Sequence, residues 1–321
     1  MRILVVGAGS IGGYFGGRLI EAGADVTFLV RPRRAEILAR TGLMIRSPLG
    51  DFHEPAPKLV TADRLETPFD LIVLSCKAYD LDDAIASFAP AVGPATAILP
   101  LLNGMRHLDA LDARFGAGST LGGQCVISAV LDAEGHILHL NEANTLTFGE
   151  RGGGRSPRAD AIAALFATAS FTTVASEAIL QDMWEKWVFI ATVAGITCLM
   201  RAAIGDIVSA GGADLASGLL DECAVIAARS GFPPRQAFLD RTRKTLTAPN
   251  SPLTASMLRD IERGAQTEAD HIVGDLLHRA DAQTGERTAL LTIALAHLNS
   301  YESRRTREAH GPPNVPGIQA A

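Results

Sequence analysis

The first thirty residues predict a strand, a helix and a second strand. Residues 3–6 (ILVV) form a continuous apolar run that ends at Gly7. Residues 10–22 then carry apolar side chains at helical spacing and stop at Gly23, and residues 25–30 (DVTFLV) form a second short apolar run. Two such runs joined by a helix favour a parallel pair of strands with a right-handed crossover.

Apolar runs and helical patterns continue to alternate up to about residue 175. Residues 69–77 (FDLIVLSCK) and 97–103 (AILPLLN) predict further strands, and residues 84–88 between them predict part of a helix. Residues 120–150 form segments of alternating apolar and polar positions, separated by breaks at Asn, Asp and Gly. This pattern predicts antiparallel strands or hairpins that close the sheet. The expected fold is α/β, with a Rossmann-type doubly wound parallel sheet.

A change to purely helical spacing marks the expected domain boundary near residue 175. The turn-rich stretch 151–158 is followed by one more predicted helix and strand, so this loop is not the boundary. From Ser176, a residue suited to cap a helix, helical spacing runs to about Glu302. We expect a dinucleotide-binding domain over 1–175, an all-helical C-terminal domain over 176–303, and a mobile tail over 304–321, which contains GPPNVPG.

Composition and charge narrow the class of protein. The 321 residues are 47% hydrophobic and 20% charged, as in a compact, soluble protein with room for two domains. A formal net charge of -6 argues against a nucleic-acid partner. The apolar run at 187–200 is too short to cross a membrane and predicts a buried helix. A single basic residue before the first apolar run, without a secretory cleavage pattern, makes the cytoplasm the expected location.

The cysteines and histidines do not predict a metal site. Four cysteines, at positions 76, 125, 198 and 223, lie far apart without a CxxC pair, so we expect reduced core thiols. His136 and His139 are close in sequence but have no further ligands near them, and a position on a strand surface explains them better. The expectation is that the protein binds no metal.

The glycines after the first strand form a GxGxxG motif in the context that dinucleotide binding requires. Gly7 allows a sharp turn, Gly9 lets the backbone approach a pyrophosphate, and Gly12 lets the helix pack closely against the strand. The phosphates would then face helix N-terminal amides. The predicted loop consists of Gly7, Ala8, Gly9, Ser10, Ile11 and Gly12. The alternative is a glycine-rich turn that holds no ligand.

The end of the second strand indicates which dinucleotide binds. NAD-binding proteins usually place Asp or Glu there for the ribose 2′-hydroxyl, whereas this chain has Arg31 and no acid. A guanidinium pairs with a 2′-phosphate through charge-assisted hydrogen bonds, so the expected cofactor is NADP(H). Arg33 and Arg34 are less well placed for this role, and a solvated basic helix start is the alternative.

Several separated segments make the chain resemble the ketopantoate reductase (2-dehydropantoate 2-reductase) family up to about residue 303. They are GAGSIGG at the N-terminus, Arg31, CKAYD with Lys77, LLNGM with Asn103, WEKW with Lys186, and SMLRDIERGAQTEAD with Ser256 and Glu268. The resemblance implies NADPH-dependent reduction of a small 2-oxo acid to the 2-hydroxy acid. In the family, this reaction converts 2-dehydropantoate to pantoate in pantothenate biosynthesis. It also implies a substrate site between the two domains.

The resemblance implies roles for individual residues. Lys186 would be the catalytic proton donor, and Glu268 would be its carboxylate partner on the hydroxyl side of the substrate. Ser256 would bind the substrate carboxylate, Asn103 would fix the carbonyl and the nicotinamide, and Lys77 would orient cofactor and substrate. Asn103, Lys77 and Glu268 are thus expected at the cofactor as well. Without the resemblance, a helix lysine is usually a surface residue and such a glutamate a solvated one.

Three positions depart from the family pattern. Ile190 and Ala194 stand one and two turns after Lys186, where the family has asparagines that contact pantoate, and Leu102 replaces a glutamine. Aliphatic side chains cannot supply those hydrogen bonds. The alternatives are therefore a reductase for a more apolar 2-oxo acid, an NADP-dependent oxidation of an amino or hydroxy acid, or a non-catalytic NADPH-binding sensor. A homodimer that pairs through the helical domain is the expected assembly.

Overall fold

The chain consists of two compact units, Met1–Met183 and Trp184–Ala321. The computed structural model describes residues 1–281 and 288–309. The division between the units falls inside one long helix, later than the boundary expected near residue 175. This helix begins in the first unit and continues into the second. The purely helical spacing of the sequence therefore starts before the first unit ends.

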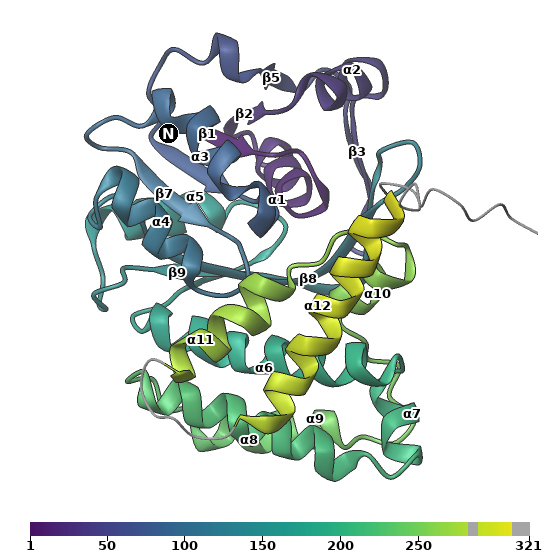
Figure 1. Ribbon diagram of the computed structural model, residues 1–321. Coiled ribbons are helices and arrows are strands. Elements are labelled where there is room, and N and C mark those ends of the chain that lie inside the picture. The colour runs from purple at the N-terminus through teal and green to yellow at the C-terminus, as the bar shows by residue number, and fades with distance from the viewer. Residues whose placement is uncertain (282–287, 310–321) are drawn as a thin grey trace, which may run out of the picture. The chain divides into compact units, whose positions relative to one another are not determined.

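The first unit contains two five-stranded sheets and their flanking helices, coloured purple to teal in Figure 1. Its strands are β1 (Arg2–Val6), β2 (Asp25–Leu29), β3 (Leu43–Arg46), β4 (Phe52–Glu54), β5 (Lys58–Val60), β6 (Leu71–Leu74), β7 (Ala97–Pro100), β8 (Gly122–Leu131), β9 (Ile137–Gly149) and β10 (Thr172–Ala175). Its helices are α1 (Ser10–Glu21), α2 (Pro32–Thr41), α3 (Leu81–Phe88), α4 (Arg106–Phe115) and α5 (Pro157–Phe166), with short 3-10 turns η1 (Ala62–Arg64), η2 (Ala78–Asp80) and η3 (Ala89–Ala91).

The first sheet is parallel, with the strand order β5-β2-β1-β6-β7. β1 lies at its centre, where Ile3 is opposite Val26 on β2 and Leu71 on β6. The chain therefore winds outward from β1 in both directions, and ligands of such sheets bind at the carboxyl ends of the strands where the order reverses. The predicted Rossmann-type doubly wound sheet is confirmed.

Alternate residues of the central strand contribute to two separate apolar cores. Ile3 and Val5 pack in a core with side chains of α1, the second sheet and α5. Leu4 and Val6 pack in another core that α3 and α4 cover. Because both faces of β1 are buried, its sequence is a continuous apolar run rather than an alternating one.

The strands at residues 120–150 do not close the first sheet, so this part of the sequence-based expectation is wrong. β8 and β9 are antiparallel, as predicted, but they belong to a second sheet with the order β10-β9-β3-β4, in which β8 pairs with β9. A single isolated bridge between Ile98 and Thr120 links this region to β7. β3, β4 and β5 were not predicted from the sequence, because runs of three or four residues are too short to show a period.

All regular elements among the described residues of the second unit are helices, as expected. Its elements are α6 (Ile179–Met200), which starts in the first unit, α7 (Ile204–Ser209), α8 (Ala213–Arg229), α9 (Gln236–Leu246), α10 (Ser256–Glu262), the π-helical turn η4 (Asp270–Gly274), α11 (Asp275–Asp281) and α12 (Ala289–Ala309). α12, yellow in Figure 1, continues beyond residue 304, where the tail was expected to begin. Residues 310–321, which contain GPPNVPG, lie outside the described part of the chain.

α6 is longer than the apolar run that predicted it. The helix spans 22 residues and is long and apolar enough, by length and composition alone, to cross a membrane. However, 72% of its most apolar window is buried inside the protein, and residues 191–198 are all buried. Burial in the core accounts for the apolar sequence of α6, in line with the predicted buried helix. In the turn before it, Ser176 Oγ accepts a hydrogen bond from the Ala178 amide.

Candidate cofactor and catalytic sites

The loop between β1 and α1 has the geometry that the glycine motif predicts. Gly7 adopts a φ of +92°, a left-handed conformation that side chains disfavour, and its amide donates to Leu29 O at 2.9 Å. A Cβ at Gly12 would collide with the backbone oxygen of Gly7 and with Ser75 Oγ. A Cβ at Gly9 would meet no described atom within 4 Å. Gly7 therefore makes the turn, Gly12 permits close packing, and Gly9 faces open space.

The start of α1 suits an anionic ligand. Gly9 is the N-cap residue and supplies no side chain to the first amides of the helix. The first turn contains no acidic residue that would repel a phosphate. Backbone amides at a helix N-terminus and the positive end of the helix dipole favour negative charge. The loop therefore fits the pyrophosphate of a dinucleotide, and the open space at Gly9 is where the backbone allows its approach.

Ser75 supports the glycine loop from the neighbouring strand and was not identified from the sequence. It follows β6, and its Oγ lies 3.0 Å from Val6 O and 3.3 Å from Gly7 O. The hydroxyl thereby holds the turn from β1 into the loop. Because β6 pairs with β1 only in the tertiary structure, no local pattern in the sequence connects Ser75 with Gly7.

The end of β2 itself has no acid, as the sequence indicates, but the structure brings an acid from another segment to Arg31. Arg31 caps α2, and its guanidinium donates to Asp80 Oδ1 at 2.7 Å. The hydrogen bond and the charge of Asp80 raise the pKa of Arg31 above its ordinary value. Asp80 ends the short turn η2, which follows β6, so it is distant from β2 in the sequence. The Arg31 side chain is 68% exposed.

Arg34 is held by backbone carbonyls rather than placed at the surface. Its Nε donates to Ala8 O at 2.9 Å, and one terminal nitrogen donates to Gly135 O at 2.9 Å. Burial lowers the pKa of Arg34, while the charge of Asp132 acts in the opposite direction. Arg34 therefore connects the glycine loop to the turn between β8 and β9. Arg33, in contrast, is exposed.

Lys77 and Asn103 leave the sheet at the same edge as the glycine loop. Leu74 on β6 is opposite Pro100 on β7, and Lys77 and Asn103 each stand three residues after this pair. Lys77 is the N-cap residue of η2, and Asn103 is half-buried ahead of Gly104, which has a φ of +76°. Two of the predicted site residues of the first unit thus lie at the carboxyl ends of adjacent strands.

In the second unit, Lys186 lies on α6, and two tryptophans on either side of it in the sequence pack against each other. Trp184 and Trp187 are buried, with ring centroids 4.9 Å apart, whereas Lys186 is half-buried. Trp187 Nε1 donates to Ile272 O at 2.8 Å, and the Ile272 amide donates to Glu268 O at 2.9 Å. The residue beside Lys186 therefore holds the helical turn that begins at Glu268.

The segment before Glu268 is fixed by α12. Both the amide and the hydroxyl of Thr267 donate to Glu302 Oε1 at 2.7 Å. The Tyr301 hydroxyl donates to Ala265 O at 2.7 Å. Burial acts to raise the pKa of Glu302, but the hydrogen bonds from Thr267 and the contact with Arg305 outweigh it and hold the pKa below its ordinary value. This anchoring carboxylate was not identified from the sequence, where Glu302 marked only the end of helical spacing.

Ser256 lies near the other end of α6. It is the first residue of α10, and the amide of the preceding Ala255 donates to Thr197 Oγ1 at 3.3 Å. Thr197 is three helical turns after Lys186, or about 16 Å along the helix axis. The structure thus brings the Glu268 segment to the Lys186 end of α6 and Ser256 to the opposite end. Ile190 lies between them on the face of Lys186, half-buried.

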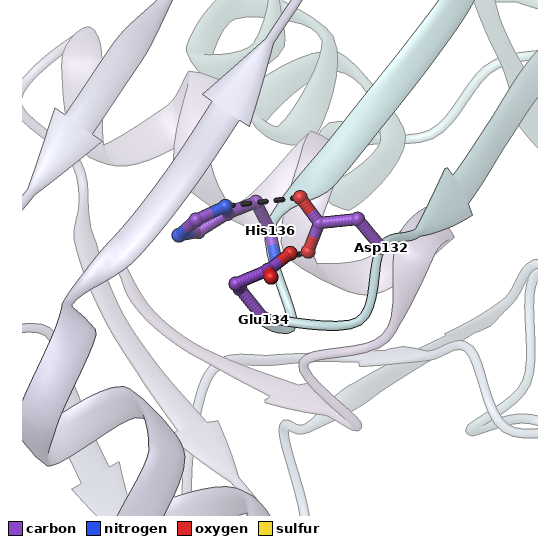
Figure 2. A group of neighbouring side chains, drawn as sticks. All are labelled: Asp132, Glu134 and His136. Atoms are coloured by element: carbon purple, nitrogen blue, oxygen red, sulfur yellow. Dashed lines mark hydrogen bonds and ion pairs between the residues drawn. The ribbon is translucent and has the colours of Figure 1, made fainter.

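Three side chains in the turn between β8 and β9 could surround a metal ion (Figure 2). The ligand atoms of Asp132, Glu134 and His136 lie within 4.8 Å of one another. Asp132 accepts hydrogen bonds from the His136 amide at 2.7 Å and from His136 Nδ1 at 3.0 Å, so it closes the turn. His139 is not part of this group, because its ring nitrogens contact Ser47 Oγ and Ala143 O. Hydrogen bonding within the turn accounts for the contact between Asp132 and His136.

Comparisons with known proteins agree over both units. The model of the family described as ketopantoate reductase PanE/ApbA matches residues 3–153, and that of its C-terminal part matches residues 178–302. The uncharacterized oxidoreductase YkpB of Bacillus subtilis is 38% identical over 306 residues, which are 95% of this chain and 100% of the relative. A 2-dehydropantoate 2-reductase of Pyrococcus horikoshii is 30% identical over 285 residues, which are 87% of this chain and 91% of the relative.

A solved structure agrees as well. The crystal structure of 2-dehydropantoate 2-reductase from Geobacter metallireducens has a TM-score of 0.85 and 27% identity, and the match covers 94% of this chain and 99% of the other. The family models match both units, and the relatives align with most of this chain. The chain therefore belongs to the ketopantoate reductase family and is an NADP-dependent oxidoreductase.

Proposed function

We propose that this protein reduces a 2-oxo acid to the 2-hydroxy acid with NADPH. In this proposal the first unit holds the nucleotide at the loop Gly7 to Gly12, and the second unit supplies Lys186 and Glu268 to the substrate. The observation that carries it is the connection from Trp187 through Ile272 to Glu268, which ties the segment of the glutamate to the helix of the lysine.

The proposed roles divide the reaction between hydride and proton. When bound, NADPH would supply a hydride for the carbonyl carbon of the substrate. As the carbon–oxygen double bond becomes a single bond, the Lys186 ammonium donates a proton to the oxygen, and solvent later returns one to the lysine. A positioned donor at a developing alkoxide stabilises charge that is absent from the ground state. Glu268 orients the ammonium, while Asn103 and Lys77 orient the carbonyl and the nicotinamide.

Ketopantoate is the substrate that the family implies, and a more apolar 2-oxo acid is the second candidate. The face of α6 that carries Lys186 continues with Ile190 and Ala194, neither of which offers a hydrogen-bonding side chain. A site that hydrogen-bonds a substrate hydroxyl discriminates strongly against analogues without it, whereas an aliphatic site does not. This observation favours a substrate whose side chain lacks the hydroxyl of ketopantoate.

A panel of 2-oxo acids tests the proposal. The full-length protein is mixed with NADPH and with ketopantoate, 2-oxoisovalerate or bulkier aliphatic and aromatic 2-oxo acids, and loss of the nicotinamide absorbance is followed. We expect turnover, with kcat/KM larger for an apolar acid than for ketopantoate. A preference for ketopantoate would refute the second candidate. Tight NADPH binding without turnover of any acid, in either direction, would refute the reductase and favour a sensor.

A further inference from the structure

A basic and an acidic side chain are in direct contact just after β2 in the first unit. Arg31 follows β2, where the adenosine ribose of a dinucleotide lies in this fold. One terminal nitrogen of its guanidinium donates to Asp80 Oδ1 at 2.7 Å, while the Arg31 side chain is 68% and the Asp80 side chain 30% exposed. The pair is therefore accessible to a ligand from solvent.

The surroundings of Arg31 are more acidic than the sequence near β2 indicates. Asp80 contacts the guanidinium directly, and Asp83, in the first turn of α3, adds a further negative charge that acts on it. Both acids come from the segment after β6, so they meet Arg31 only in the folded unit. The positive charge of Arg31, which would attract a 2′-phosphate, is thus already partly neutralised.

The two nicotinamide dinucleotides differ in what they bring to this pair. The 2′-phosphate of NADPH is attracted by Arg31 but repelled by Asp80, and it has to share the guanidinium with the carboxylate. The 2′-hydroxyl of NADH carries no charge and can donate a hydrogen bond to a carboxylate, which is the usual role of an acid near this position. Arg31 therefore favours NADPH, and Asp80 opposes that preference.

We propose that Asp80 is a specificity-determining residue that limits the preference of this protein for NADPH over NADH. The inference rests on the proposed function in one respect, namely that a nicotinamide dinucleotide binds at the glycine loop with its adenosine ribose beside Arg31. It adds that the degree of selectivity is set by a pair of residues, of which only Arg31 is apparent from the sequence around β2.

Arg34 provides an internal comparison for this role. Its guanidinium donates to Ala8 O and Gly135 O, so it holds the glycine loop rather than the 2′ position. The pyrophosphate that the loop binds is common to NADPH and NADH. Substitution of Arg34 is therefore expected to weaken both dinucleotides to the same extent, whereas substitution of Asp80 changes their ratio.

Equilibrium binding of both dinucleotides tests the proposal without any substrate. Dissociation constants of NADPH and NADH are measured by fluorescence titration for the full-length wild-type protein, Asp80→Asn and Arg31→Ala, at low and moderate salt. Asp80→Asn is expected to tighten NADPH binding roughly fivefold and to change NADH binding less than twofold, with a smaller gain at higher salt. Arg31→Ala is expected to weaken NADPH roughly tenfold or more, with little effect on NADH.

A matched control separates this effect from a general change of charge. Asp82→Asn removes the same charge from an exposed neighbour in the first turn of α3 and is expected to leave the NADPH to NADH ratio unchanged. The inference is overturned if Asp80→Asn leaves the ratio within twofold of wild type, or if Asp82→Asn shifts it equally. If the wild-type protein binds neither dinucleotide, the proposed function fails together with it, whereas binding without turnover refutes the reductase alone.

Discussion

The glycine loop of the first unit and the Lys186 to Glu268 region of the second unit are built in different ways. In the loop, Gly7, Gly9 and Gly12 lie within six residues, and their roles depend on backbone conformation and on the absence of a side chain. Lys186 and Glu268 are far apart in sequence and belong to one region because Trp187 and Glu302 bind the segment around Glu268. The loop is a local structure, whereas the second region is assembled by long-range hydrogen bonds.

This difference determines how each region tolerates substitution. A methyl group added at Gly12 would collide with the backbone oxygen of Gly7, which belongs to the loop itself. A methyl group added at Gly9 would enter space that no described atom fills, where we expect the ligand. In the second region, Glu302 supports Glu268 through Thr267. A substitution of Glu302 therefore changes the position of Glu268 but leaves the Glu268 carboxylate in the protein. The two regions should therefore differ in which measured quantity a substitution affects.

The largest expected effect is that of Lys186→Ala. Loss of the proton donor is expected to lower kcat roughly 10²- to 10⁴-fold with the best 2-oxo acid, while the dissociation constant of NADPH stays unchanged because the loop belongs to the other unit. Steady-state kinetics and fluorescence titration measure the two quantities. Lys244→Ala, at an exposed position of α9, removes the same charge and should leave both unchanged. Retention of kcat in Lys186→Ala would remove the lysine from the mechanism.

Two alanine substitutions in the loop are expected to separate folding from ligand binding. At Gly12, the Cβ would collide with Gly7 O, so Gly12→Ala should lower the free energy of unfolding by roughly 1–3 kcal/mol and abolish NADPH binding. At Gly9, where φ is -80° and the space is open, Gly9→Ala should leave stability unchanged but weaken NADPH roughly tenfold or more. Thermal unfolding and titration measure both. Normal NADPH binding by Gly9→Ala would contradict the proposed pyrophosphate site.

The smallest expected effect is that of substituting Glu302, which contacts Thr267 and so supports the neighbouring Glu268 indirectly. Glu302→Ala leaves the Thr267 amide without its acceptor and should cost roughly 1–3 kcal/mol of unfolding free energy, with a lower kcat/KM. Glu302→Gln keeps an oxygen acceptor and should restore most of kcat/KM. If both variants are equally impaired, the charge of Glu302 and not its position near Thr267 is what matters.

The pH dependence of stability gives a second test of Glu302. Its pKa in the folded protein is held below the ordinary value of 4.5, so its contribution to stability is complete above pH 4.5 and is lost as the pH falls through the folded pKa. Denaturant unfolding at pH 7 and at lower pH should therefore show a steeper acid loss for wild type than for Glu302→Gln. An identical acid loss in the two proteins would contradict this assignment.

The parts that the sequence predicted are those whose signal is local. The continuous run of β1, the glycine motif and the helical period of α6 each fall within about two dozen residues, and the structure has the corresponding elements. The second sheet was misassigned because β3 and β4 are too short to show a period and because pairing partners are not encoded next to one another. Ser75 was missed for the same reason, since only the pairing of β6 with β1 brings it to the loop.

By itself, the sequence determined the fold class, the position of the dinucleotide loop and the family, because apolar period, glycine conformation and motif order are properties of contiguous segments. Only the tertiary structure decided that Asp80 meets Arg31, that Arg34 holds Ala8 and that Glu302 anchors the segment before Glu268. Hydrogen bonds and charge pairs depend on distances in space, and these distances exist only once strands and helices from separate parts of the chain have packed together.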